Sequence, residues 1–282
     1  MAGADDINAQ ASVLMKQGIR LLDAGAPAEA LPFFEQALEL RQQLPASNPI
    51  YAFGLAACWL NRGDALKHRG DPESIAEAIR SYDAGIAAME PLALDSDPRF
   101  PRRLAIGHQN RGLLHLSQGR VDAAISDLHK GIGVLERSES ATIEDRHYLL
   151  AAAWLNVATA RAAAPDGDSQ LAARHAAHRA VDLAAALEDS HAQFADVGLR
   201  ARHVICRTLI DRLSGAAPLH DVHEATDAVD DGLRVARAWA QRGHSEFAAL
   251  ADDLFRFGER VYAAYQPQHL QEFINEHERS EG

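Results

Sequence analysis

The feature that most constrains this chain is a small residue that recurs at nearly constant intervals within apolar, helix-like patterns. In three of its five occurrences, an asparagine stands two positions before this small residue. The recurring positions are Gly18, Gly63, Gly112, Ala158 and Cys206, at intervals of 45 to 49 residues. Self-similarity with a period of about 20–50 residues is typical of arrays of one repeated structural unit. The sequence therefore predicts five repeats stacked in a row.

Each repeat also contains a second pattern, in which a small residue is followed four positions on by a larger one and three further on by another small one. In the first repeat these residues are Ala30, Phe34 and Ala37. The later triplets are Ala78, Tyr82 and Gly85; Ala124, Leu128 and Gly131; Ala173, Ala177 and Ala180; and Ala225, Val229 and Gly232. This spacing places all three side chains on one face of a helix, where a neighbouring helix crosses. We therefore expect a second helix in every repeat.

A turn signal separates the two helices of the first three repeats. Gly25, Gly70 and Gly119 stand between the two patterns, and Pro27 and Pro72 follow two of them. Glycine adopts the left-handed conformation that ends a helix, and proline suits the first turn of the next one. Alternating β-branched residues, which would indicate strands, are essentially absent. Each repeat is thus predicted to be a helical hairpin in an all-α fold.

These residues resemble the tetratricopeptide repeat (TPR) family. The second repeat carries the family's order of an aromatic, an asparagine, small residues and a turn glycine, in Trp59, Asn61, Gly63, Leu66, Gly70, Ala78, Tyr82 and Gly85. The period is longer than the family's ~34 residues, mostly through linkers such as residues 90–103. The resemblance implies a right-handed superhelical solenoid of about five TPR-like helical hairpins, closed by a C-terminal capping helix.

The same patterns give the expected domain organisation. Residues 1–10 form an N-terminal tail, and residues 11–242 form the repeat array. Its units are 11–45, 50–91, 104–137, 145–188 and 195–242. A capping helix and tail occupy residues 245–282, with the capping helix over residues 245–265 and a short final helix expected in the tail. The terminal helix of a repeat array needs a polar outer face, because that face is exposed to water.

Composition narrows the partners and the compartment. The net charge of −12, from 40 acidic and 28 basic residues, argues against nucleic acid or an anionic membrane as the main ligand. Only two cysteines are present, Cys58 and Cys206, so no disulfide framework is indicated. The acidic start of the chain is unlike a secretory signal, and no stretch is apolar enough to span a membrane. We expect a cytoplasmic protein.

The resemblance implies that the first helix of each repeat lines an inner groove that binds a segment of another protein. An asparagine side chain can both donate to and accept from a peptide backbone, so Asn61, Asn110 and Asn156 are expected to contact the partner. The alternative is that these amides bond a neighbouring helix. Further partner-binding candidates from adjacent positions are Lys16, Asp64, Lys67, Gln109, Leu113, Leu155 and Thr159.

Two other functions stay open at this stage. A self-assembling scaffold could use the apolar faces of the terminal helices, through Phe247, Leu254, Phe257 and Tyr262, to form an oligomer. A metal protein or enzyme could use the helical histidine pairs His175 with His178 and His220 with His223. No phosphate-binding loop or nucleophile motif is present, so we predict no enzyme, no metal and no cofactor.

Overall fold

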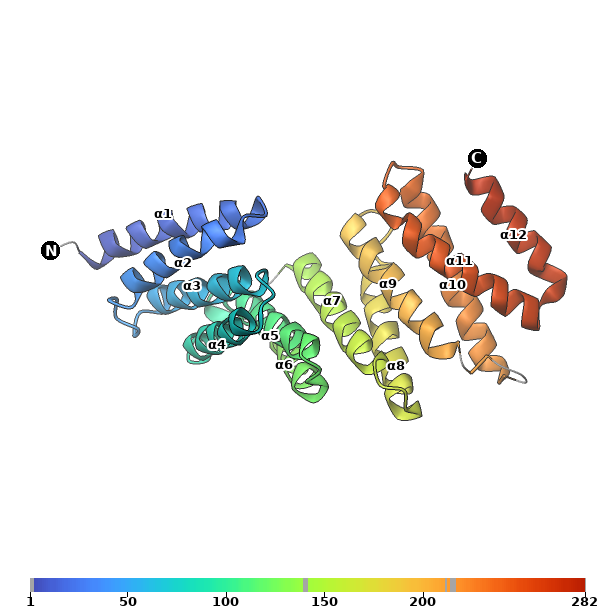
Figure 1. The fold of residues 1–282 in the computed structure, drawn as a ribbon, viewed down its shortest axis with the longest axis horizontal. Helices are drawn as coiled ribbons and strands as arrows, with labels where there is room; N and C mark the ends of the chain where they lie inside the picture. Colours follow the sequence, from blue (N-terminus) through green and yellow to red (C-terminus); the bar gives the residue numbers. More distant parts are fainter. Residues whose placement is uncertain (1–2, 139–141, 211, 214–216, 282) are drawn as a thin grey trace. The chain divides into compact units, whose positions relative to one another are not determined.

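The computed structural model describes residues 3–138, 142–210, 212–213 and 217–281, and in this part of the chain every regular element is a helix. This confirms the all-α prediction. The chain divides into two compact units, Met1–Thr142 and Ile143–Gly282 (Figure 1). Among the described residues, no helix combines the length and the apolar character needed to cross a membrane.

The first unit consists of three helical hairpins. Its helices are α1 (Ala4–Asp23), α2 (Pro27–Arg41), α3 (Pro49–Lys67), α4 (Pro72–Met89), α5 (Arg99–Ser117) and α6 (Val121–Arg137), with a 3-10 turn, η1 (Leu94–Ser96), in the linker after α4. Consecutive helices pack against each other, and α3 also contacts both α1 and α5. The first helices of successive hairpins are therefore direct neighbours.

The second unit repeats this arrangement. Its helices are α7 (Ile143–Ala162), α8 (Gly167–Ala185), α9 (Ala192–Leu209), α10 (Leu219–Ala240), α11 (Ala248–Tyr265) and α12 (Pro267–Glu281), with the 3-10 turn η2 (Ser245–Phe247) before α11. Here too each helix packs on the next, and α9 contacts both α7 and α11. In each unit the packing is that of a TPR-like helical solenoid.

The sequence patterns account for the hairpins of the first unit. Gly25, Gly70 and Gly119 have φ angles of 74°, 73° and 70°, which is the left-handed conformation that residues with a Cβ rarely adopt. The packing triplet also behaves as predicted, because Phe34 is fully buried against Gly18. A Cβ at position 18 would lie 2.5 Å from the Phe34 ring, so the recurring glycine is a site of close helix–helix approach.

The N-terminal end of the chain differs from the expectation. The predicted tail over residues 1–10 is helical from Ala4 onwards. Two acidic residues in its first turn, Asp5 and Asp6, suit the positive end of the helix dipole, and Asp6 accepts a hydrogen bond from the Gly3 N–H at 3.1 Å. At the other end, α11 lies where the capping helix is predicted, and α12 lies where a short final helix is expected.

Candidate functional site

The first asparagine of the series, Asn61 on α3, is buried at the contact with α5. Its Oδ1 accepts a hydrogen bond from Arg103 Nη2 on α5 at 3.2 Å. Its Nδ2 has no hydrogen-bond partner within the part of the chain that the structure describes. With only 4% of its surface exposed, Asn61 acts mainly as a link between two neighbouring first helices.

Asp64, one turn further along α3, is the centre of a polar network. Its Oδ1 accepts hydrogen bonds from Lys67 Nζ at 3.0 Å, Tyr82 OH at 2.6 Å and Asn110 Nδ2 at 2.9 Å. Burial, and then the charge of Asp64, raises the pKa of Tyr82 well above its usual range. The phenol therefore stays protonated as a donor. The network joins α3 to its own second helix, α4, and to α5 of the next hairpin.

The ten predicted partner-binding residues fall into three groups by their exposure to solvent. Lys16, Leu113 and Thr159 are exposed; Asp64, Lys67, Asn110 and Asn156 are half-buried; Asn61, Gln109 and Leu155 are buried. Only members of the first two groups can touch a partner without rearrangement of the helices. Leu155, Asn156 and Thr159 belong to the second unit, and the other seven to the first.

The second-unit candidates form no comparable network. Thr159 Oγ1 donates to the Leu155 carbonyl one turn back, at 2.9 Å, which satisfies this hydroxyl within its own helix. Asn156 stands at the same place in its repeat as Asn61 and Asn110, yet it makes no hydrogen bond to the residues that the structure describes. The asparagine position therefore has a partner only where the adjacent helix supplies one.

Sequence reasoning missed three contributors to this region, Ile19, Tyr82 and Arg103. Ile19 directly follows the recurring Gly18, as Asp64 follows Gly63 and Leu113 follows Gly112. This shared position was the available signal. Ile19 is 37% exposed and Leu113 is 39% exposed, while the Asp64 side chain is 18% exposed. Three successive first helices thus present an apolar, an acidic and an apolar side chain; we refer to Ile19, Asp64 and Leu113 as the α1–α3–α5 row.

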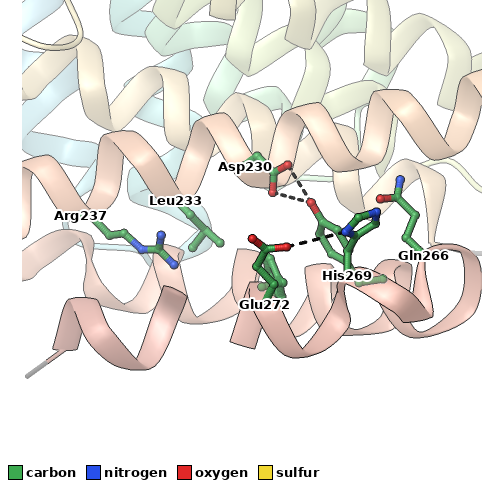
Figure 2. A pocket seen from close by; sticks show the side chains of 8 residues that line it. Asp230, Leu233, Arg237, Gln266, His269 and Glu272 are labelled. Atoms are coloured by element: carbon green, nitrogen blue, oxygen red, sulfur yellow. Dashed lines mark hydrogen bonds and ion pairs between the residues drawn. The ribbon is translucent and has the colours of Figure 1, made fainter. Parts of the chain in front are cut away.

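A pocket of about 450 Å³ lies in the second unit among α10, α11 and α12 (Figure 2). Its polar side chains bond one another: Tyr262 OH donates to Asp230 Oδ2 at 2.8 Å, and His269 lies 3.8 Å from Glu272. Phe273 of α12 is buried at its floor, stacked on Tyr262 with ring centroids 4.5 Å apart. The arrangement serves to attach α12 to the unit.

The apolar residues that were considered for self-assembly are covered by the second unit itself. Phe247, Leu254 and Phe257 are 3%, 0% and 8% exposed, and Tyr262 bonds Asp230. Leu254 packs where Gly232 of α10 leaves room, since a Cβ there would lie 2.6 Å from it. Phe247, Leu254 and Phe257 therefore lie in the interior of the unit, while Tyr262 is half-buried.

The histidine pairs bond neighbouring carboxylates separately. His178 Nε2 lies 2.8 Å from Glu224 Oε1, and His220 Nε2 lies 3.3 Å from Asp221 Oδ1. Across the described ranges of the chain, no three His, Cys, Asp or Glu residues gather as a metal site would require. Each contact involves one histidine and one carboxylate, and Asp221 is fully buried.

Comparison with known proteins agrees with this architecture. No protein-family model matches the sequence, and no curated protein matches it. A solved structure of the nearly identical TPR-like repeats of a protein described as a kinesin light chain, from Podosopora anserina, is similar to this chain. The match covers 93% of this chain and 99% of that one, with a TM-score of 0.51 and 15% sequence identity. The chain therefore has a TPR-like helical repeat fold, a class that generally presents surfaces for protein interaction or scaffolding.

Proposed function

We propose that this chain is a protein-interaction module that binds an extended segment of a partner protein over α1, α3 and α5 of the first unit. The observation that carries the proposal is the α1–α3–α5 row, in which Ile19 and Leu113 are exposed apolar side chains at equivalent places on either side of Asp64. Helical repeats commonly use such stacked inner helices for binding rather than for catalysis. We accordingly assign no catalytic role.

The spacing of the row limits what the partner segment looks like. Packed helices lie about 8–10 Å apart, so two helix spacings separate Ile19 from Leu113 by about 16–20 Å. An extended chain advances about 3.3 Å per residue. The matching segment has two apolar side chains about five or six residues apart, with a polar residue between them that faces Asp64, Lys67 and Asn110.

The test compares two double variants in capture from native cytosol. Ile19→Asp with Leu113→Asp replaces both apolar members of the row. Val13→Asp with Leu171→Asp makes the same chemical change at side chains that are 57% and 44% exposed and lie outside the row. Exposed substitutions of this kind usually change stability by less than about 0.5 kcal/mol, and circular dichroism checks that both variants fold.

A partner that is retained by the wild type and by the control variant, but reduced about tenfold or more in the row variant, supports the proposal. The same partners captured equally by all three proteins would refute it, and so would the absence of any wild-type partner. Replacing Asn61 or Asn110 is a poorer first test, because each side chain bonds a neighbouring helix and its loss also weakens the fold.

We further propose a cytoplasmic location. Cys58 and Cys206 are unpaired and buried, which is typical of proteins from a reducing compartment. Fractionation of the native cells, followed by detection of the chain, tests this assignment; recovery with a membrane or secreted fraction would contradict it.

A further inference from the structure

The first unit contains a second hollow, between α4, α5 and α6, that the proposed function does not use. It has a volume of about 660 Å³, within the range of about 300–1,000 Å³ that is usual for binding pockets. Ile86, Leu104 and Val134 give it apolar walls, and Leu94 adds an apolar side chain from η1. Leu94 belongs to the lengthened linker that makes this repeat longer than the usual one. We refer to this site as the α4–α6 hollow.

This hollow opens on a different face of α5 from the polar network. Leu104, His108 and Arg111 line it, whereas Arg103 and Asn110 bond residues of α3. Because an α-helix turns about 100° per residue, the two sets of side chains point about 120° apart. A ligand in the α4–α6 hollow would therefore not compete for the α1–α3–α5 row.

The α6 side of the hollow presents two cationic side chains on one face of the helix. Lys130 and Arg137 are seven residues apart, and Gly133 and Val134 lie between them on the same helix face. The Lys130 side chain is 58% exposed, and its Nζ lies 4.0 Å from Asp127. Arg137 is exposed and has no ion-pair partner among the described residues. Gly133 has no side chain, and the Arg137 guanidinium lies over it, since a Cβ at position 133 would be 3.3 Å from Arg137 Nη1.

The remaining charges leave these two cations available. Arg111 is fully occupied, since it bonds both Asp127 oxygens at 2.6 and 2.7 Å and Asp83 at 2.6 Å. His108 is 7% exposed, and its Nδ1 lies 3.6 Å from Asp127 Oδ1. On the α4 side, Glu90 makes no ion pair within the described part of the chain. Glu90 and Asp83, whose side chain is 54% exposed although it pairs with Arg111, are the two lining carboxylates that oppose an acidic ligand.

From this pattern we propose that the α4–α6 hollow binds an amphipathic helix of a partner protein that carries two carboxylates seven residues apart and a large apolar side chain between them. The carboxylates pair with Lys130 and Arg137, and the apolar side chain packs against Val134, Leu104 and Ile86. Helices bind grooves in this way through side chains three, four and seven residues apart. Cationic walls beside an apolar floor make the acidic helix the complementary partner.

The experiment uses designed peptides as probes. An alanine-rich helical peptide of about 20 residues carries glutamates seven positions apart and a leucine four positions after the first. A matched peptide has lysines in place of the glutamates. Binding to the full chain is measured by isothermal titration calorimetry and by NMR shifts of α6 amides, at peptide concentrations up to about 1 mM.

Three variants locate the site. Lys130→Glu with Arg137→Glu is expected to weaken binding of the acidic peptide about fivefold or more, and added salt is expected to weaken wild-type binding, because the ion pairs are exposed. Gly133→Leu places a side chain where the Arg137 guanidinium lies, so it blocks the hollow beside Val134 while both charged residues are kept and glycine is replaced by a better helix former. Glu90→Gln is expected to tighten binding. Arg20→Glu with Arg102→Glu, at two exposed positions away from the hollow, is the charge-matched control.

Selective binding of the acidic peptide that is lost in the α6 charge variant and in Gly133→Leu, but kept in the control, establishes the site. Equal binding of both peptides overturns the proposal. So does binding that survives both α6 changes, or no binding of the acidic peptide at about 1 mM. Circular dichroism of each variant separates loss of the site from loss of the fold.

Discussion

The hydrogen bond between Asp64 and Asn110 offers a direct test of whether the repeated asparagine supports the fold. Asn110 Nδ2 donates to Asp64 Oδ1 at 2.9 Å, and the acceptor is a carboxylate whose side chain is 18% exposed. Hydrogen bonds to charged groups contribute about 1.5–3 kcal/mol. Partial solvent screening at this site reduces the expected value to about 1–2 kcal/mol. Asn110→Ala should therefore lower the free energy of unfolding of the first unit by about 1–2 kcal/mol.

The matched control is Asn156→Ala, since Asn156 stands at the same place in its repeat and bonds none of the described residues. It should change stability by less than about 0.5 kcal/mol. A double-mutant cycle of Asp64→Ala with Asn110→Ala isolates the pair and should give a coupling energy of about 1 kcal/mol or more. Because the two units can unfold separately, urea unfolding is combined with hydrogen exchange of the α3 and α5 amides. A coupling energy near zero, or equal effects of Asn110→Ala and Asn156→Ala, would refute the reasoning.

Three further predictions follow from buried contacts. Gly18→Val should destabilise the first hairpin by about 1–3 kcal/mol in thermal unfolding, since a Cβ already meets the Phe34 ring at 2.5 Å; an unchanged melting temperature would contradict this. Burial acts to raise the pKa of Asp127, but His108 and Arg111 outweigh it and hold the pKa well below its usual range. The stabilisation by Asp127 is present above the pKa of about 4 that an aspartate has in the unfolded chain, and it is lost as pH falls below that value. The difference in unfolding free energy between wild type and Asp127→Asn should therefore shrink in acid. A difference that is independent of pH would argue against this role of Asp127. Burial raises the pKa of Cys58 to about 11, so the folded protein should resist alkylation at pH 8 until denaturant is added, as mass spectrometry would show.

The sequence was sufficient for the hairpins because their determinants are local. The turn glycines have the predicted left-handed φ angles, and the triplet residues Phe34 and Tyr82 are fully buried. Spacing along one helix fixes which side chains share a face. Nothing comparable fixed the helical start at Ala4, because Asp5 and Asp6 suit either a solvated tail or the first turn of a helix.

The polar partners could not be predicted, because they depend on how one hairpin is placed on the next. Arg103 lies in the linker-proximal turn of α5, outside the repeated pattern, yet it bonds Asn61 from 42 residues away in sequence. The length of the preceding linker decides which turn of α5 meets Asn61. Because the repeat period varies from 45 to 49 residues, the polar contacts between hairpins cannot be predicted, even where the repeat motif itself is clear.

The difference between equivalent asparagines bears on how this fold acquires binding surfaces. Asn61 receives Arg103 and Asn110 receives Asp64, so in the first unit the amides are used in joining helices. The residues directly after the recurring glycines are Ile19, Asp64 and Leu113. The two apolar residues, Ile19 and Leu113, are exposed. Helix packing needs the glycine and uses the asparagine, whereas the residue after the glycine is exposed at Ile19 and Leu113 and joins helices only at Asp64. Partner specificity in this chain is therefore expected to depend on that position, and exchanging Leu113 with Ile19 should alter partner choice less than placing a charge at either site.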